Sequence, residues 1–235
     1  GQTGFEQRLR VREAIEKHDG ILEENSGPDI VLRGRKRPEP VQIDRHLLFS
    51  KGPAADLLNL ELRPGDEIYV EPAQDFFIVG IAEKPQPHLL THHYTLSQVF
   101  SESVLSAIEG GALLVLRHSS IPETESIVDL HELTNGNKAL DLAISAGDRI
   151  YVVQEGDFYV GGDVERPGLY SSKDDMTLGR ALETAGLPPS SLPRPVSVQR
   201  WENGERTEYS PSGPEKDFTR DLPISDRDII LVAEG

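Results

Sequence analysis

"LRPGDEIYV" (residues 62–70) is followed by two variants of itself, "ISAGDRIYV" (144–152) and "ISDRDIILV" (224–232). In each copy a tight turn and an aspartate lead into a short apolar strand. The aspartates of the three copies are Asp66, Asp148 and Asp228. Successive copies lie 82 and 80 residues apart, and a period this long and regular indicates internal structural repeats.

The period divides the chain into three repeats. We predict a partial repeat one at 1–73, repeat two at 74–156 and repeat three at 157–235. Small domains bury a limited share of their surface. We therefore expect neighbouring repeats to support one another.

The composition excludes several classes of partner and site. The chain carries 40 acidic and 24 basic residues, for a formal net charge of −16. Nucleic acids and anionic membrane surfaces attract basic faces, so neither is an expected partner. The absence of cysteine excludes disulfides, thiolate zinc sites and cysteine nucleophiles. No apolar run reaches the ~18 residues of a membrane span, and no signal peptide is visible at the start.

Repeat three has the clearest pattern. "DFYVGGDVERPGLYSS" (157–172) predicts two strands joined by a turn at Pro167 and Gly168. "MTLGRALETAG" (176–186) predicts a helix, because its apolar residues recur on one face, with an N-cap at 174–175. Further strands are predicted at 195–201, 206–210 and 228–235, with an Asn-Gly hairpin signal between the first two.

Repeat two follows the same order. Its sequence pattern predicts a hairpin at 75–90 and a helix at 94–104. Three strands follow, at 112–118, 126–133 and 148–153. Each complete repeat thus reads β-β-α-β-β-β, an α+β unit with one helix on a small mixed sheet, and the apolar closing strand is expected at the sheet centre.

Repeat one is incomplete. A helix is predicted at 9–20 and strands at 29–34, 40–48 and 66–72, but nothing corresponds to the opening strand "DFYVGG" of repeat three. Either the chain is a fragment cut inside a repeat, or another segment supplies that strand. We therefore expect the sheet of repeat one to have an open or borrowed edge.

Three motifs of repeat three, "VGGDVERPGLY", "MTLGRALETAG" and "ISDRDIILV", together resemble the SLBB domain, the soluble-ligand-binding β-grasp. Its pattern is a G-x-V-x-x-P-G-x-Y turn, a TL-x-x-A-L-x-x-A-G helix and a closing PGD-x-I-x-V strand. Repeat two departs from it, with "PQPHL" (85–89) at the turn and no final Ala-Gly in its helix. Repeat one lacks the opening strand and keeps "PGDEIYV" (64–70). The resemblance implies tandem β-grasp domains.

Tandem SLBB domains are familiar from bacterial outer-membrane proteins that export capsule or exopolysaccharide, where they stack into periplasmic rings. The resemblance therefore implies a periplasmic or outer-membrane-associated piece of such an assembly. The chain shows no counterpart of the export domain and no amphipathic helix that would cross the outer membrane. SLBB domains also occur in cobalamin-binding, competence and respiratory-complex proteins, so the fold alone does not fix the function.

No catalytic motif is present. G-x-S-x-G, H-E-x-x-H, P-loop and G-x-G-x-x-G patterns are all absent, and the glycines of "GGDVERPG" (161–168) are read as turn residues. His88, His92 and His93 are close in sequence, but adjacent residues of a strand point to opposite faces and chelate poorly. We expect no metal, no cofactor and no enzymatic activity.

One basic cluster stands out in the acidic chain: Arg33, Arg35, Lys36 and Arg37. It is either a solvated hairpin tip or a contact for an acidic polymer or a neighbouring subunit, because the arginine fork binds both oxygens of a carboxylate. Trp201 either stacks on a sugar or, as the preferred interpretation, caps the small core.

Repetition favours a structural role for Asp66, Asp148 and Asp228, whose carboxylates are expected to accept backbone N–H bonds in the turn. Pro167 and Gly168 are likewise read as structural. We expect a non-enzymatic structural and binding module of a polysaccharide export assembly, with homo-oligomers, other export subunits or polysaccharide as partners. The alternative is a soluble β-grasp protein that binds a small ligand or sugar in a concave pocket.

Overall fold

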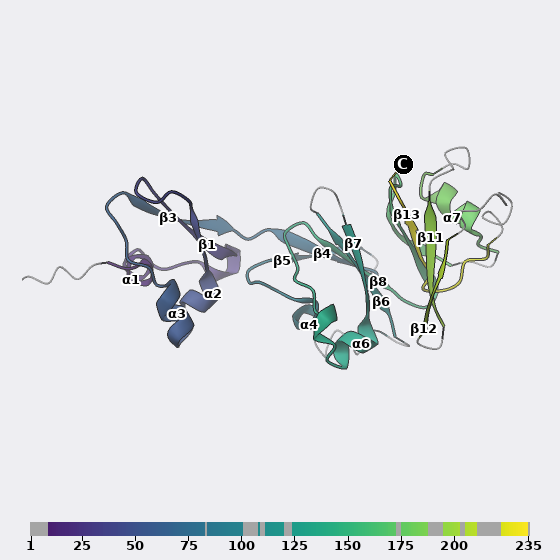
Figure 1. Cartoon of the computed structure of the whole chain (residues 1–235), viewed down its shortest axis with the longest axis horizontal. Coiled ribbons are helices and arrows are strands. Elements are labelled where there is room, and N and C mark those ends of the chain that lie inside the picture. The colour runs from purple at the N-terminus through teal and green to yellow at the C-terminus, as the bar shows by residue number, and fades with distance from the viewer. Residues whose placement is uncertain are drawn as a thin grey trace, which may run out of the picture. The chain divides into compact units, whose positions relative to one another are not determined.

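The computed structural model describes residues 9–82, 84–100, 108, 111–119, 124–172, 175–187, 195–202, 205–210 and 222–234. Its strands form three sheets and its helices are short (Figure 1). The predicted α+β class is confirmed. The chain forms two compact units, one of Gly1–Asp75 with Leu89–Tyr94 and one of Phe76–His88 with Thr95–Gly235. Each sheet takes its strands from one of the three sequence repeats.

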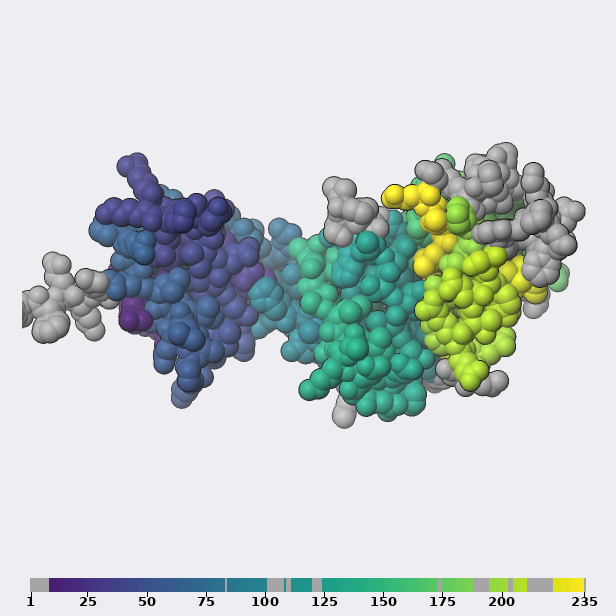
Figure 2. Space-filling view, in the orientation of Figure 1, coloured from purple at the N-terminus to yellow at the C-terminus, as the bar shows by residue number. Residues whose placement is uncertain are grey.

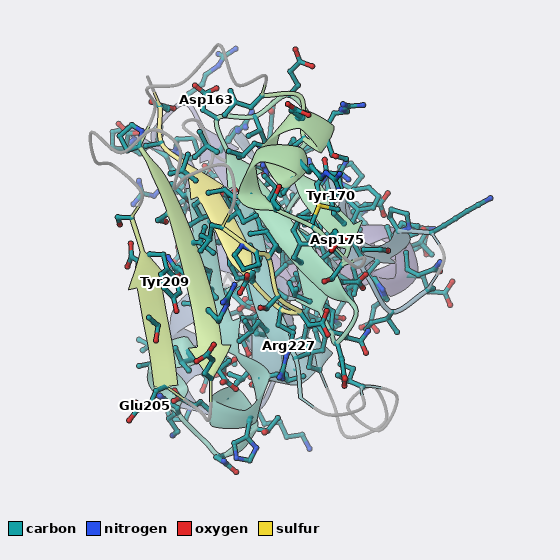
Figure 3. All side chains as sticks on the ribbon, turned by 90° about the vertical axis from the view of Figure 1, so that its right-hand side faces the viewer. Asp163, Tyr170, Asp175, Glu205, Tyr209 and Arg227 are labelled. Carbon is teal, nitrogen blue, oxygen red and sulfur yellow. The ribbon has the colours of Figure 1, made fainter. Side chains whose placement is uncertain are left out.

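The sheet of repeat three has the strand order β10-β9-β13-β11-β12. Its strands are β9 (Asp157–Gly162), β10 (Gly168–Ser171), β11 (Val196–Glu202), β12 (Glu205–Tyr209) and β13 (Ile229–Val232). The apolar β13 is central, as predicted, and runs parallel to β9 and antiparallel to β11. Figure 3 shows β13 in yellow beside β11, with Glu205 and Tyr209 marking the edge strand β12.

Helix α7 (Leu178–Thr184) lies on one face of this sheet (Figure 1). Its apolar side packs into a buried cluster with the inward residues of β9, β11 and β13. The predicted N-cap at 174–175 is wrong, and the cap is Thr177. Thr177 is the last residue with extended backbone, and its hydroxyl accepts a hydrogen bond from the Arg180 N–H. A residue nearer the first turn therefore takes the capping role.

The sheet of repeat two has the matching order β5-β4-β8-β6-β7. Its strands are β4 (Asp75–Val79), β5 (Gln86–Leu89), β6 (Leu113–His118), β7 (Thr124–Asp129) and β8 (Arg149–Val153). The central strand β8 is again parallel to the opening strand, β4, and antiparallel to β6. Helix α4 (Leu96–Val99) occupies the start of the predicted helix, and residues 101–104 of that prediction lie outside the described residues. A short 3-10 turn, Lys138–Leu140, follows later in the repeat.

Two predicted strands, at 40–48 and 126–133, are too long. In both, a helix replaces the second half: α2 (Arg45–Leu48) after β2 (Val41–Asp44), and α6 (Leu130–Thr134) after β7. The reason is an aspartate at each boundary. The Asp44 carboxylate accepts the Leu47 N–H at 2.7 Å, and the Asp129 carboxylate accepts the His131 N–H at 2.8 Å. Each carboxylate caps a new helix and ends the strand.

Repeat one forms a sheet of three strands in the order β2-β1-β3, with β1 (Ser26–Gly34) at the centre and β3 (Asp66–Pro72) at one side. Its helices are α1 (Val11–Lys17), α2 and α3 (Pro53–Leu58), with a 3-10 turn at Glu23–Asn25. Val11 and Ile15 of α1 join Ile30 and Leu32 of β1 in a buried cluster. Within the described residues β3 is an edge strand, as we expect from the missing opening strand.

The two five-stranded sheets of the second compact unit share a buried core. Leu113, Val115, Tyr151 and Val153 of repeat two pack with Tyr159 and Ile229 of repeat three. In repeat three, Tyr159 and Ile229 alternate with the strand residues that pack on α7, so this sheet uses its helix-free face for the contact. The rings of Tyr151 and Tyr159 lie 4.9 Å apart. Figure 2 shows the teal side chains of repeat two directly against the green and yellow ones of repeat three.

Candidate functional site

The repeated aspartate closes the same turn in all three repeats. The carboxylate of Asp66 accepts the N–H of Arg63 at 2.9 Å. Asp148 and Asp228 accept the N–H of Ser145 and of Ser225 at 2.8 Å. The predicted acceptance of backbone N–H bonds is therefore present at each copy.

Each of these aspartates also meets a basic side chain from the neighbouring antiparallel strand or its hairpin. Arg37 places Nε and Nη2 at 3.0 and 2.7 Å from Oδ2 of Asp66. His118 Nδ1 lies 3.1 Å from Oδ2 of Asp148, and Arg200 contacts both oxygens of Asp228. The aspartate side chains are 0–2 % exposed. A buried carboxylate requires such partners because an unpaired buried charge is costly.

These contacts shift the titration of two groups. The pKa of Asp66 is lowered, first by the hydrogen bond from Arg37 and then by the backbone bond from Arg63. The pKa of Arg200 is raised by its hydrogen bonds to Asp228. Both shifts favour the charged forms, so these pairs are internal structural contacts of the repeats.

The basic hairpin connects β1 to β2. Arg33, Arg35 and Lys36 are exposed. Arg37 differs, because its side chain is 10 % exposed and its guanidinium binds Asp66. The side chain of Arg63 bonds the carbonyl of Lys36 at 3.1 Å, which fixes the tip of the hairpin. The three exposed side chains, which we call the basic tip, are the part of the predicted cluster that remains accessible.

The histidines do not converge. His93 Nε2 lies 2.9 Å from Oδ1 of Asp29, whereas the His92 ring packs edge-on against His46. His88 stacks on Phe76, with ring centroids 5.3 Å apart. The pKa of His92 is lowered by burial first and then by the charges of its neighbours. Among the described residues, no group of three or more His, Asp or Glu is placed to hold a metal ion.

Glu125 on β7 joins the two five-stranded sheets through hydrogen bonds. Its carboxylate accepts the hydroxyl of Tyr159 at 3.0 Å and the N–H of Gly162 at 3.0 and 3.1 Å. Arg117 on β6 approaches it to 3.1 Å. The glutamate side chain is 10 % exposed. Burial first, and the charge of Glu125 second, raise the pKa of Tyr159.

A cavity of about 530 Å³ opens beside this junction. It is lined by Arg117, Glu125, Gly162, Asp163, Val164, Val232 and Glu234. Gly162 has a φ of +75°, and a Cβ there would overlap the carbonyl oxygen of Val232. Three carboxylates and one guanidinium make the lining polar. Such a lining suits a small hydroxyl-rich or amine-bearing ligand.

The remaining predicted residues have structural surroundings. The predicted turn at Pro167 and Gly168 is only partly right, because the connection between β9 and β10 spans 163–167 and Gly168 is the first residue of β10. Trp201 is half-buried and packs against the core between the two sheets, and the Arg206 guanidinium lies 5.9 Å from its ring centroid. This contact agrees with the preferred interpretation of Trp201 as a cap over the core.

Sequence reasoning did not identify Glu125, Arg117 or the cavity. Glu125 lies in an ordinary strand of repeat two. Its hydrogen-bond partner Gly162 belongs to repeat three and is 37 residues further along the chain. The only signal was the Gly161-Gly162 pair, because glycine in a strand often marks close approach of another group. A Cβ on Gly161 would overlap the Glu125 carboxylate.

No family model matches the chain, and no curated protein matches its sequence. In the described part of the chain, no helix is long and apolar enough to cross a membrane.

Proposed function

We propose that this chain is a non-enzymatic structural and binding module of a bacterial polysaccharide export assembly, built from β-grasp repeats of the SLBB type. In this proposal it acts in the periplasm, associated with the outer membrane, without a cofactor. It binds further copies of itself or other export subunits. The exported capsule or exopolysaccharide is a further candidate partner.

One observation supports this proposal above the others: the two five-stranded sheets have the same strand order around the same aspartate turn. Because of this shared order, the three motifs of repeat three that resemble the SLBB domain and the corresponding segments of repeat two lie at matching points of the two sheets. The buried aspartates are bound to basic partners within their own repeats, which is a structural use of charge. A shared buried core packs repeats two and three against each other, as is expected of tandem repeats that support one another.

The basic tip is the proposed contact for an acidic polymer or the acidic face of a neighbouring subunit. Arg33, Arg35 and Lys36 are exposed and adjacent in a chain with a net charge of −16, so they offer a polyanion a local basic site. Arginine binds carboxylates through two parallel hydrogen bonds. Uronic-acid polysaccharides present such carboxylates.

The first experiment measures the solution mass by light scattering over a range of protein concentrations and salt. We expect oligomers of defined mass, and a strict monomer under all conditions would remove support for the assembly. Titration with acidic oligosaccharides follows. We expect binding that weakens with salt and that Arg35→Glu abolishes. Lys51→Glu is the matched control, because Lys51 is also exposed in repeat one but lies outside the basic tip.

The cavity beside Glu125 favours a second candidate, a β-grasp module that binds a small sugar or amine. Calorimetric titration with neutral and amino sugars tests it. Binding that is lost on Glu125→Gln and unaffected by Arg35→Glu would favour this candidate over the polymer contact.

A further inference from the structure

The segment Leu89–Tyr94 belongs to repeat two by sequence but to the compact unit of repeat one by structure. It begins at the end of β5 and stops just before α4, and we call it the strap. The chain passes between the two compact units at 75–76, 88–89 and 94–95, and the last two of these passages flank the strap. Release of the strap from repeat one would therefore leave one passage in place of three.

A buried arginine of repeat one holds the strap by its backbone. Arg45, the first residue of α2, is 4 % exposed. Its Nη2 donates to the carbonyl of Thr91 in the strap at 2.8 Å, and its Nε donates to the carbonyl of Gly27 in β1 at 3.1 Å. Both acceptors are uncharged, and a guanidinium is always protonated. Arg45 therefore sets a permanent positive charge beside the strap.

Near this charge, the strap packs one imidazole against another. The rings of His92 and His46 lie 5.0 Å apart, edge to face. His92 is half-buried, and its Nδ1 lies 2.9 Å from the hydroxyl oxygen of Thr91. If His92 took a proton here, its charge would be partly removed from water and would be repelled by the guanidinium of Arg45. This packing therefore suits a neutral His92.

The other charged groups that face His92 come from α2, its cap and the 3-10 turn Glu23–Asn25. Arg45 and His46 of α2 disfavour a proton on His92. Asp44 at the cap of α2 and Glu23 of the 3-10 turn favour it. Burial is the largest influence, and the pKa of His92 is lowered on balance. The attached strap therefore holds His92 in its neutral form.

His93, the next residue of the strap, acts in the opposite sense. Its Nε2 lies 2.9 Å from Oδ1 of Asp29 and 4.0 Å from Oδ2 of Asp44. A proton on His93 attracts these carboxylates and holds the strap more firmly. Its side chain is 53 % exposed, so solvent and salt screen this attraction. The half-buried His92 therefore has the larger influence on the strap.

We propose that the strap is an acid-sensitive latch, which stays on repeat one while His92 is neutral and is released when His92 takes a proton beside Arg45 and His46. The released strap binds this proton at the ordinary histidine pKa of 6.5, and the attached strap binds it only at lower pH. Attachment is therefore fully favoured above pH 6.5 and weakens as the pH falls below that value. The pKa of Asp66 lies below 3.8, so the latch responds before that carboxyl does.

Amide hydrogen exchange of the whole chain, measured by NMR between pH 7.5 and pH 5.5, tests the latch. The reporter is Leu90 in the strap, which is 7 % exposed and whose N–H donates to the carbonyl of Gln74 at 2.8 Å. Leu32, in the core of repeat one, reports unfolding of the whole unit. Each rate is divided by the intrinsic exchange rate at that pH. We expect protection of Leu90 to fall by about threefold to tenfold, and that of Leu32 to stay within twofold.

Three variants assign the effect. His92→Gln removes the titrating ring and keeps a polar side chain, so protection of Leu90 is expected to stay constant across this pH range. His18→Gln is the matched control, because His18 is an exposed histidine of the same compact unit that lies outside the strap. It should show the wild-type fall. His93→Gln removes the opposing ion pair and should make the fall larger.

Titration of the His92 ring in the wild type, followed by its Cε1–H resonance, does not depend on any variant folding. We expect a midpoint below pH 6.5, and a midpoint at or above that value would overturn the latch. Constant protection of Leu90 in the wild type would also overturn it, as would a fall that His92→Gln retains. Equal falls at Leu90 and Leu32 would show that acid unfolds the whole unit instead of releasing the strap.

Discussion

Arg200 binds both carboxylate oxygens of Asp228: Nε lies 2.8 Å from Oδ1, and Nη2 lies 2.7 Å from Oδ2. The same Nη2 donates to the carbonyl of Pro223 at 2.8 Å. Asp228 is fully buried, and Arg200 is the basic side chain that compensates its charge. In repeat one, Arg37 directs Nε and Nη2 at a single oxygen of Asp66, Oδ2, and its Nη2 also donates to the carbonyl of Glu61. An arginine–aspartate pair is therefore present in repeats one and three, and His118 takes the place of the arginine in repeat two.

Arg200→Met is expected to destabilise the second compact unit by about 3 kcal/mol, because it leaves a buried carboxylate without its cation. Urea unfolding followed by circular dichroism measures the loss. Arg206→Met is the control: Arg206 pairs with Glu208 at the surface, with both side chains about half exposed, so a change of under about 1 kcal/mol is expected. Similar losses in the two variants would show that Arg200 acts as an ordinary surface arginine.

The sequence predicts the repeats, the order of helices and strands along each complete repeat and the central position of the closing strand, but not the strand order of the sheets. These follow from local patterns: apolar alternation, turn residues and the recurring Asp-x-Ile. It does not predict which basic side chain meets each aspartate, because His118 and Arg200 are 30 and 28 residues from their partners. The strand-ending role of Asp129 was missed for another reason, since an aspartate inside an apolar run reads as a solvent-facing strand residue.

The packing of the sheets of repeats two and three against each other could not be predicted from the sequence either. Tyr151 of repeat two faces Tyr159 and Ile229 of repeat three in this contact. The alternation of side chains along a strand does not show which face of a sheet packs on a second sheet. Glu125 adds a polar contact whose partners, Tyr159 and Gly162, belong to the next repeat. The small size of the repeats predicts that they support one another, but it does not predict which residues make the contact.

Acidification is expected to weaken repeat one through Asp66. The pKa of this carboxyl is lowered in the folded state, below the ordinary value of 3.8, chiefly by the hydrogen bond from Arg37. The stabilisation is therefore fully present well above pH 4 and is lost as the pH falls through the folded pKa. Amide exchange at Leu32, in the core of repeat one, reports this stability.

The control for that titration is Asp66→Asn, which cannot ionise. We expect the variant to be less stable than the wild type at neutral pH and to lose less stability between pH 6 and pH 3. Parallel losses in the two proteins over this range would show that other carboxylates govern the acid response of repeat one.

Alkaline titration is expected to report the core between repeats two and three. Burial raises the pKa of Tyr159 and of Tyr151 above the ordinary value of 10. The neutral phenols stabilise the fold fully below pH 10, and this stabilisation is lost as the pH rises beyond 10, because the unfolded chain then releases protons that the folded chain retains. Ultraviolet absorbance of phenolate should therefore show a late phase that coincides with unfolding.

Tyr159→Phe assigns that late phase. In this variant the absorbance of the late phase should fall by one tyrosine, and the absorbance of the earlier phase should not change. In urea, all remaining tyrosines should titrate together. Its hydroxyl bond to Glu125 is also removed, which is expected to cost about 1 kcal/mol at neutral pH. An unchanged late phase would place Tyr159 outside the buried core.

The turn before each closing strand contains a residue with left-handed backbone conformation. Substitutions at Gly65 measure the free energy of unfolding that this conformation costs a residue with a side chain. Gly65 and Gly147 have φ of +88° and +81°, and Arg227 takes the same place in repeat three with φ of +63°. A Cβ on Gly65 meets nothing within 4 Å, so Gly65→Ala isolates the backbone term, expected at about 1 kcal/mol. Gly65→Asn should cost less, because asparagine adopts this conformation more readily. Amide exchange in β1 measures both variants, and equal losses for alanine and asparagine would show that the backbone conformation is not what the turn selects.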